Sequence, residues 1–249
     1  CMQTKLTSLF LVYPLSAVFR MVPNTNAKHF LSFVGGLFLM QWIYGADWIH
    51  SFITTAVTYL LCKMAPKKYV HIAVFIWVMG YMTLSHIYRM YVSYMTGIFD
   101  FTGTQMVITM KLTSFAYNLY DGTYDFKRVF SVYDPVTEKK KARVYADRKR
   151  FAIEEMPSAL EFFGYVFNFS CILAGPAFEY KDYLLSVTGK VFEIGRDKND
   201  TSKSQPSSFF VGLKLLLLGV VCLIGHLKLS AAVPVSNGYN ATWIAENPS

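Results

Sequence analysis

The sequence predicts an all-α, polytopic membrane helical bundle, and three observations lead to this fold class. Apolar residues make up 53% of the 249 positions and charged residues only 16%, and the mean hydropathy is positive, at +0.31. Apolar runs of nearly membrane-spanning length recur along the chain, with most charges gathered between them. A soluble domain of this length can bury a core without such runs. We therefore expect five to seven membrane helices.

The expected helices correspond to seven apolar segments, which in chain order are residues 6–22, 29–44, 48–62, 70–94, 99–120, 158–178 and 209–227. A helix needs about 20 residues to cross about 30 Å of hydrocarbon. The second and third segments are short for this, which leaves tilted, re-entrant and interfacial placements open. We assign residues 1–249 to part of a single membrane domain, with a basic loop at about 123–150 and polar loops at about 181–207 and 228–249.

The fourth segment ends in two ionisable residues, His86 and Arg89, which lie one helical turn apart. Arg89 either extends its charge from the helix end toward water or faces the interior. Ionisable residues inside a membrane usually face the bundle interior or a cavity. His86 is therefore either a hydrogen-bonded structural residue or part of a site.

The fifth segment is polar on two sides, although it is long enough to span. At about 100° per residue, one side carries Thr104, Lys111, Ser114, Asn118 and Asp121, and the opposite side carries Thr102, Gln105, Thr109 and Thr113. Lipid cannot hydrogen-bond these groups. We expect both polar sides to face other protein segments or a water-filled cavity.

Residues 123–150 hold nine basic and four acidic residues, a net charge of +5. Much of the chain's net charge of +8 therefore lies in one loop between apolar segments. This distribution is typical of a loop on the cytoplasmic face and gives no reason to expect a nucleic-acid partner. Attraction of anionic headgroups or of an anionic cosubstrate is the alternative interpretation.

The sixth segment has helix boundary signals, with Pro157 suited to a first turn and Gly175 followed by Pro176 suited to the end. On one helix, Ser158, Glu161, Tyr165 and Asn168 share a face, since they lie at i, i+3, i+7 and i+10. Such a polar face either hydrogen-bonds neighbouring helices or forms the wall of a tunnel for a lipid substrate.

Other sequence signals are weak. The four cysteines, Cys1, Cys62, Cys171 and Cys222, have no metal-ligand or redox spacing, so we expect no metal site and no bound cofactor. Glycosylation sequons occur at Asn168, Asn199 and Asn240. The first lies inside an apolar run, which argues against its modification, and the other two depend on topology.

Several blocks together resemble the membrane-bound O-acyltransferase family, and its lysophospholipid acyltransferases most closely. They are His86-Ile-Tyr-Arg-Met, Asp100-Phe-Thr-Gly-Thr-Gln-Met, Lys111-Leu-Thr-Ser, Asp121-Gly122, Met156-Pro-Ser-Ala-Leu-Glu, Asn168-Phe, Ala174-Gly-Pro and Tyr180-Lys-Asp-Tyr. Their order, their spacing and the basic loop between the two groups of blocks also fit. The resemblance covers nearly the whole chain up to about residue 183.

The resemblance implies transfer of a fatty acyl group to lysophospholipid, with acyl-coenzyme A as the cosubstrate, by a multi-pass protein of the endoplasmic reticulum membrane. The family's catalytic histidine lies in a Trp-His-Gly motif in a late helix, and this sequence contains no such motif. Its five histidines fall in the part that corresponds to the family's amino-terminal half. We therefore expect an amino-terminal fragment that has no catalytic residue and is inactive alone.

Nine polar residues are then candidates for tunnel-lining or structural roles: His86, Arg89, Gln105, Lys111, Asn118, Asp121, Glu161, Tyr165 and Asn168. A non-enzymatic polytopic protein, transporter-like or scaffolding, is the main alternative. Inverted repeats would favour it, and we find none. A truncated, inactive form is a third possibility.

Overall fold

The computed structural model describes residues 2–92, 101–124, 139–173, 175, 177–190 and 209–232, and within these ranges it contains helices and turns but no strand. The predicted all-α fold class is confirmed. The chain divides into two units, Cys1–Glu193 and Ile194–Ser249. We describe each unit by itself.

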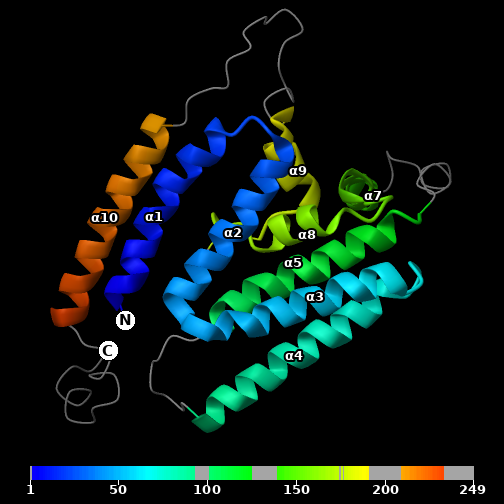
Figure 1. The fold of residues 1–249 in the computed structure, drawn as a ribbon, viewed down its shortest axis with the longest axis horizontal. Helices are drawn as coiled ribbons and strands as arrows, with labels where there is room; N and C mark the ends of the chain where they lie inside the picture. The colour runs from blue at the N-terminus through cyan, green and yellow to red at the C-terminus, as the bar shows by residue number, and fades with distance from the viewer. Residues whose placement is uncertain are drawn as a thin grey trace, which may run out of the picture. The chain divides into compact units, whose positions relative to one another are not determined.

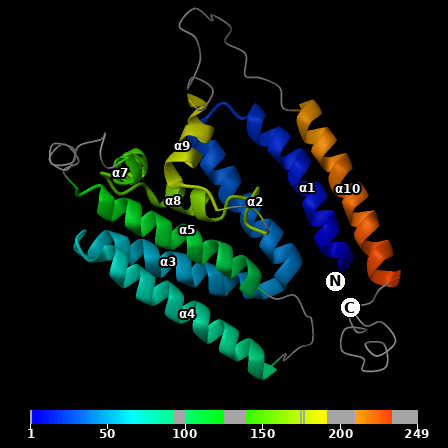
Figure 2. The ribbon, with the colours of Figure 1, turned by 180° about the vertical axis from the view of Figure 1, so that it is seen from behind.

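The first unit begins with long helices joined by short connections (Figure 1). Helices α3, α4 and α5 run alongside one another, and both views show α8 between α2 and α5 (Figures 1 and 2). The long helices of this unit are α1 (Met2–Met21), α2 (Thr25–Tyr44), α3 (Trp48–Met64), α4 (Val70–Val92) and α5 (Thr102–Asp121), with a 3₁₀ turn, η1 (Gly45–Asp47), between α2 and α3.

Local sequence sets the ends of α2. The Asn24 side chain caps its start by accepting from the backbone N–H of Asn26 at 3.0 Å. Gly45 ends it with a positive φ of 61°, which glycine adopts without steric cost. The chain can therefore turn through η1 directly into α3.

Two described helices, Val70–Val92 and Phe209–Ser230, are long and apolar enough to cross a membrane by length and composition. The other long helices carry more polar residues. In α3, for example, Thr54, Thr55 and Thr58 are buried, and each hydroxyl donates to the carbonyl four residues earlier. The expected count of five to seven membrane helices stays a prediction.

The sixth segment differs from the single long helix that we expected. Helix α8 is only eight residues long (Ala159–Val166), and turns follow it as far as residue 173. It ends early because Asn168 forms its own turn, its Oδ1 accepting from the N–H of Ser170 at 3.0 Å. Ser158 caps the helix start, and Asn168 lies beyond its end. The expectation that Ser158, Glu161, Tyr165 and Asn168 share one helix face was therefore wrong.

Two of the expected loops contain helices. Helix α7 (Lys139–Phe151) lies in the basic loop, where Lys, Arg and Ala are good helix formers, and α9 (Tyr180–Thr188) takes up the start of the polar loop at 181–207. In the second unit, α10 (Phe209–Ala232) continues past residue 228, and none of its described side chains is buried. Asp100, Lys127, Arg128, Ala174, Pro176, Asn199 and Asn240 lie outside the described residues.

Aromatic side chains of α8 form the centre of the first unit. Phe163 lies 5.6 Å from the ring centroid of Phe33 on α2 and 5.5 Å from that of Phe52 on α3. Phe162 lies 4.8 Å from the ring centroid of Phe115 on α5. A Cβ at Gly36 would lie 1.7 Å from the carbonyl oxygen of Phe167, so glycine is what lets α2 approach the end of α8. This short helix thus connects three long ones.

Candidate functional site

The predicted polar side of α5 faces the end of α8. Lys111, the central residue of this side, is fully buried. Its Nζ donates to the carbonyl oxygens of Tyr165 at 2.8 Å and Val166 at 3.3 Å, and to Sγ of Cys171 at 2.9 Å. Both carbonyls belong to the last turn of α8, where a helix leaves acceptors unpaired and carries partial negative charge. Lys111 therefore caps α8 with a cation.

Aromatic rings complete the surroundings of Lys111. Its Nζ lies 5.0 Å from the ring centroid of Tyr165 and 4.5 Å from that of Phe178. No carboxylate of a described residue forms an ion pair with it. The ammonium group is thus held by carbonyl dipoles, a sulfur atom and π faces.

One turn along α5, two side chains bind a carboxylate that the sequence reasoning did not include. Ser114 Oγ and Asn118 Nδ2 both donate to Oε2 of Glu179, each at 2.6 Å. Glu179 directly precedes α9, so this contact joins α9 to α5. We call Lys111, Ser114, Asn118 and Asp121 the α5 seam, because each binds a segment that follows α5 in the chain.

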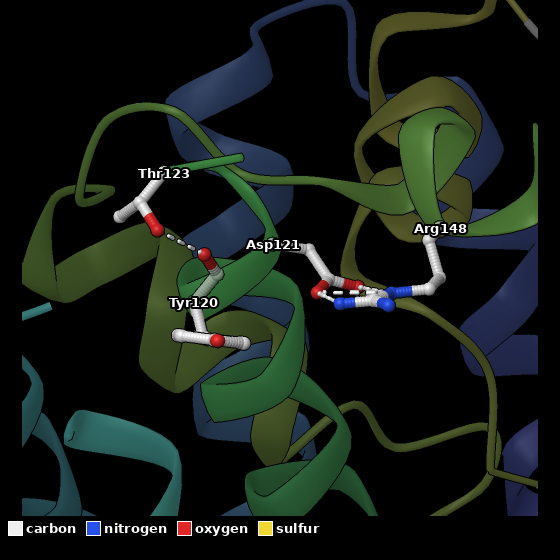
Figure 3. A network of polar contacts seen from close by, with 4 residues as sticks. All are labelled: Tyr120, Asp121, Thr123 and Arg148. Carbon is white, nitrogen blue, oxygen red and sulfur yellow. Dashed lines mark hydrogen bonds and ion pairs between the residues drawn. The ribbon is translucent and has the colours of Figure 1, made fainter. Parts of the chain in front are cut away.

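The last residue of the seam binds the basic helix α7. Asp121 accepts from Arg148, with Nε lying 3.1 Å from Oδ1 and 3.0 Å from Oδ2, and NH2 forms a further ion pair with Oδ1 (Figure 3). This hydrogen bonding raises the pKa of Arg148 above its usual value. The backbone also contributes, since the N–H of Ile153 donates to the carbonyl of Asn118 at 2.8 Å. Figure 3 also shows Thr123 donating to the carbonyl of Tyr120, which closes the turn after α5.

The opposite polar side of α5 faces α3 and α4. Gln105 is fully buried, accepting from Ser51 Oγ at 2.8 Å and donating to Thr54 Oγ1 at 3.1 Å. Arg89 of α4 donates to Thr102 Oγ1 at 3.0 Å, so its guanidinium also contacts α5. As expected, both polar sides of α5 are turned toward protein.

The remaining predicted residues have separate roles. Glu161 completes a capping box with Ser158 at the start of α8. The Tyr165 hydroxyl donates to the Phe178 carbonyl at 2.9 Å, and Asn168 Nδ2 donates to Ser32 Oγ at 3.3 Å. His86 is half-buried and makes no hydrogen bond to a described residue. Lys111, Asn118 and Asp121 thus lie along one side of α5, and Tyr165 of α8 contacts Lys111 there. His86 does not take part in these contacts.

The sequence reasoning also missed a buried histidine and tyrosine pair. His29 of α2 has no exposed surface, and its Nδ1 lies 2.9 Å from the hydroxyl of Tyr183 on α9. Its Nε2 has no hydrogen-bond partner among the described residues. Nothing in the local pattern signals this pair, because its members are 154 positions apart.

A cavity of about 300 Å³ opens beside this pair. Asn168 is the one predicted site residue in its wall. Residues of α1, of the turn after α8, and of α9 and its preceding segment line it: Ser16, Phe19, Asn168, Phe169, Ser170, Phe178, Asp182, Tyr183, Ser186 and Val187.

Comparison with known proteins identifies the family. Residues 87–244 match the model of the membrane-bound O-acyltransferase family. The chain belongs to this family. The matched range contains the whole α5 seam, α8 and α9, so the family likeness covers the segments that this seam holds together.

Similar proteins of the membrane-bound O-acyltransferase family come from animals and yeast. Membrane-bound glycerophospholipid O-acyltransferase 2 of Rattus norvegicus is 28% identical over 84% of this chain and 38% of its own length. Lysophospholipid acyltransferase 6 of Drosophila melanogaster is 31% identical over 86% of this chain and 29% of its own length. Lysophospholipid acyltransferase of Saccharomyces cerevisiae is 31% identical over 69% of this chain and 27% of its own length. The chain thus spans about two fifths or less of the length of these relatives.

Proposed function

We propose that the whole protein transfers a fatty acyl group from acyl-coenzyme A to the free hydroxyl of a lysophospholipid in the endoplasmic reticulum membrane. Residues 1–249 form its amino-terminal part. The observation that carries the proposal is the family match over residues 87–244, together with relatives named as lysophospholipid acyltransferases. The reaction remodels phospholipids by restoring the second acyl chain.

The chemistry requires a base, an oxyanion donor and exclusion of water. The lysophospholipid hydroxyl loses its proton as it attacks the thioester carbonyl, a step in which a positioned histidine is the usual general base. A polar donor then stabilises the tetrahedral oxyanion. Water must be kept out because hydrolysis competes with transfer. We assign the base to a histidine outside residues 1–249, since none of the five histidines here lies in a Trp-His-Gly motif.

The α5 seam and the helices that it binds supply the frame around such a site. The α5 seam fixes α8 through Lys111, α9 through Glu179 and α7 through Arg148. Aromatic residues of α8 fill the space among α2, α3 and α5. Aromatic packing of this kind would help to exclude water, which is the competing nucleophile in acyl transfer.

An acyl-transfer assay tests the proposal. Microsomes from cells expressing the full-length protein receive labelled acyl-coenzyme A and a series of lysophospholipids, and formation of diacyl phospholipid is measured against microsomes from cells without it. We expect transfer that depends on the lysophospholipid, and no transfer from residues 1–249 expressed alone. Release of coenzyme A without a lysophospholipid acceptor would contradict the proposal, as would no transfer to any acceptor at normal protein level.

The same assay separates tunnel-lining from structural residues. Asp121, Glu161 and Asn168 are each changed to Ala, and both protein level and activity are measured. Because Asn168 lies in the cavity wall, we expect Asn168→Ala to lower activity more than protein level. Asp121 binds Arg148 and Glu161 caps α8, so loss of activity should follow loss of folded protein for these two. Equal behaviour of all three variants would assign Asn168 a structural role.

A further inference from the structure

A lysine and a cysteine from segments far apart in the chain meet in the core of the first unit. Nζ of Lys111 on α5 lies 2.9 Å from Sγ of Cys171, which belongs to the turn after α8. Both side chains are buried, and the two residues are 60 positions apart. Nitrogen and sulfur are here closer than their van der Waals contact. A single bridging oxygen atom would therefore join them with little movement of either side chain.

Further contacts hold each of the two side chains in this position. Lys111 also donates to the carbonyls at the end of α8, and its Nζ lies against the rings of Tyr165 and Phe178. Sγ of Cys171 lies 3.6 Å from the carbonyl oxygen of Asn168. Two groups that are held together in this way react as one unit, because the cost of bringing them together has already been met in folding.

The cavity that α9 lines extends to the residues next to this pair. Its wall includes Ser170, which directly precedes Cys171 in the chain, and Phe178, whose ring centroid lies 4.5 Å from Nζ of Lys111. Exposure usually governs the oxidation of cysteine, and Cys171 has little exposed surface. A cavity of about 300 Å³, however, has room for several molecules of the size of water. A small oxidant such as hydrogen peroxide therefore has space beside the pair.

We propose that Lys111 and Cys171 form a covalent link in the presence of peroxide, in which one oxygen atom joins Nζ to Sγ. The link replaces the cation that caps α8 with a covalent connection between α5 and the turn after α8. Because its ends are 60 positions apart, it closes a long loop of the chain and stabilises the fold as a disulfide does, by restricting the unfolded state. This redox modification does not depend on the proposed acyl transfer.

The link requires two molecules of hydrogen peroxide and releases three of water. The Cys171 sulfur attacks one peroxide, the O–O bond breaks, and the leaving hydroxide takes the thiol proton, which gives a sulfenic acid and water. The Lys111 amine, once its extra proton has passed to solvent, breaks the second peroxide in the same way and becomes a hydroxylamine, with a second water. The hydroxylamine oxygen then attacks sulfur and displaces hydroxide, which leaves as the third water with the hydroxylamine O–H proton.

The order of these steps follows from the contacts of the pair. No carboxylate of a described residue forms an ion pair with Lys111, so no fixed negative charge retains its extra proton. The sulfenic acid forms within reach of the amine, whereas a cysteine without such a neighbour continues to sulfinic and sulfonic acid. We therefore expect the link to protect Cys171 from irreversible oxidation.

Peptide mapping of the full-length protein tests the proposal. Purified protein is treated with hydrogen peroxide, and one half is then reduced with a thiol reagent. Both halves are digested with a protease and analysed by tandem mass spectrometry. We expect the oxidised half to contain a joined pair of peptides that carry Lys111 and Cys171, with the summed mass plus one oxygen atom and minus two hydrogen atoms. The reduced half should lack it. Absence of the joined pair, or a joined pair without the added oxygen, would overturn the proposal.

Variants distinguish the link from general oxidation of cysteines, with the unfolding temperature in detergent as the measurement. Peroxide should raise the unfolding temperature of the unchanged protein, and reduction should reverse the rise. Cys171→Ser keeps an oxygen that accepts from Lys111 but has no sulfur, so its unfolding temperature should not rise. Cys62→Ser is the matched control, because Cys62 is also buried but has no hydrogen bond to a lysine among the described residues. This variant should respond to peroxide as the unchanged protein does.

Two results of the variant experiment would show that the proposal is wrong. One is an equal rise in unfolding temperature with and without Cys171, which would place the reacting group elsewhere. The other is sulfinic or sulfonic acid as the sole product at Cys171 in the unchanged protein, which would show that the amine does not capture the sulfur. Neither experiment contains an acyl donor or acceptor, so failure here leaves the acyltransferase proposal untouched.

Discussion

Helices α4 and α5 pack directly against each other, yet they differ sharply in how many of their side chains are buried and in how polar those side chains are. Of the 23 residues of α4, five are buried, and they form one stripe: Val70, Val74, Val78, Met82 and Ser85. Of the 20 residues of α5, twelve are buried, and seven of these twelve are polar. Of these two helices, only α4 is long and apolar enough to cross a membrane.

The difference indicates that the low hydropathy of α5 goes together with burial of its polar side chains against neighbouring segments of the protein. A helix that presents most of its surface to lipid needs apolar side chains, and α4 has them. A helix surrounded by protein can be polar if each group finds a partner. We therefore expect α5 to depend on close contacts and hydrogen bonds, and α4 to depend on one packed stripe.

The largest expected effect comes from adding a methyl group at the end of α5. A Cβ at Gly122 would lie 1.8 Å from the carbonyl oxygen of Ile153, so Gly122→Ala must displace the backbone and the Ile153 to Asn118 hydrogen bond. We expect a loss of about 3 kcal/mol of unfolding free energy, measured as a lower unfolding temperature in detergent. Gly80→Ala is the matched control in α4, where an added Cβ meets nothing within 4 Å. A Gly80→Ala effect as large as that of Gly122→Ala would remove the contrast between the helices.

Next in size is Lys111→Met, which makes α5 more apolar and should nevertheless destabilise it. The change removes the Lys111 donor from the carbonyls of Tyr165 and Val166 and leaves the Tyr165 carbonyl only its backbone donors at the end of α8, at a cost of about 2 kcal/mol. Lys63→Met is the control, because Lys63 is exposed at the end of α3. Unfolding temperatures of both variants give the comparison. A more stable Lys111→Met protein would show that hydropathy, and not capping of α8, decides the stability of α5.

A smaller loss of stability is expected when a side chain of α4 is truncated. The test compares two residues of this helix that lie two positions apart. Val78 is fully buried and Ile76 is 66% exposed. Lipid is as apolar as a protein core, so truncation there costs only the lost packing. We expect about 1 kcal/mol for Val78→Ala and no measurable change in unfolding temperature for Ile76→Ala. Equal destabilisation by the two would mean that Ile76 contacts protein rather than lipid.

Which features of the fold and of the site could be predicted from the sequence depends on how far apart in the chain the contacting residues lie. Periodicity predicted the polar sides of α5, because Gln105 and Lys111 belong to one regular helix whose faces follow from spacing alone. The early end of α8 was missed, although Asn168-Phe-Ser carries a local turn signal, since the apolar run around it continues unbroken. Glu179 and His29 could not be found, because their partners on α5 and α9 are 61 and 154 positions away. Only the fold brings such groups together.

The smallest effect concerns the ion pair that joins the end of α5 to α7. Asp121 is 7% exposed and Arg148 is 32% exposed, whereas Asp182 and Arg150 are 40% and 63% exposed. A double-mutant cycle with Asp121→Asn and Arg148→Gln should give a coupling of about 1 kcal/mol. The same cycle on Asp182 and Arg150 should give about 0.3 kcal/mol, because water screens an exposed pair. The coupling is read from unfolding temperatures of the single and double variants. If both cycles gave the same small value, the backbone hydrogen bond from Ile153 to Asn118, rather than the ion pair of Asp121 and Arg148, would hold the end of α7 against α5.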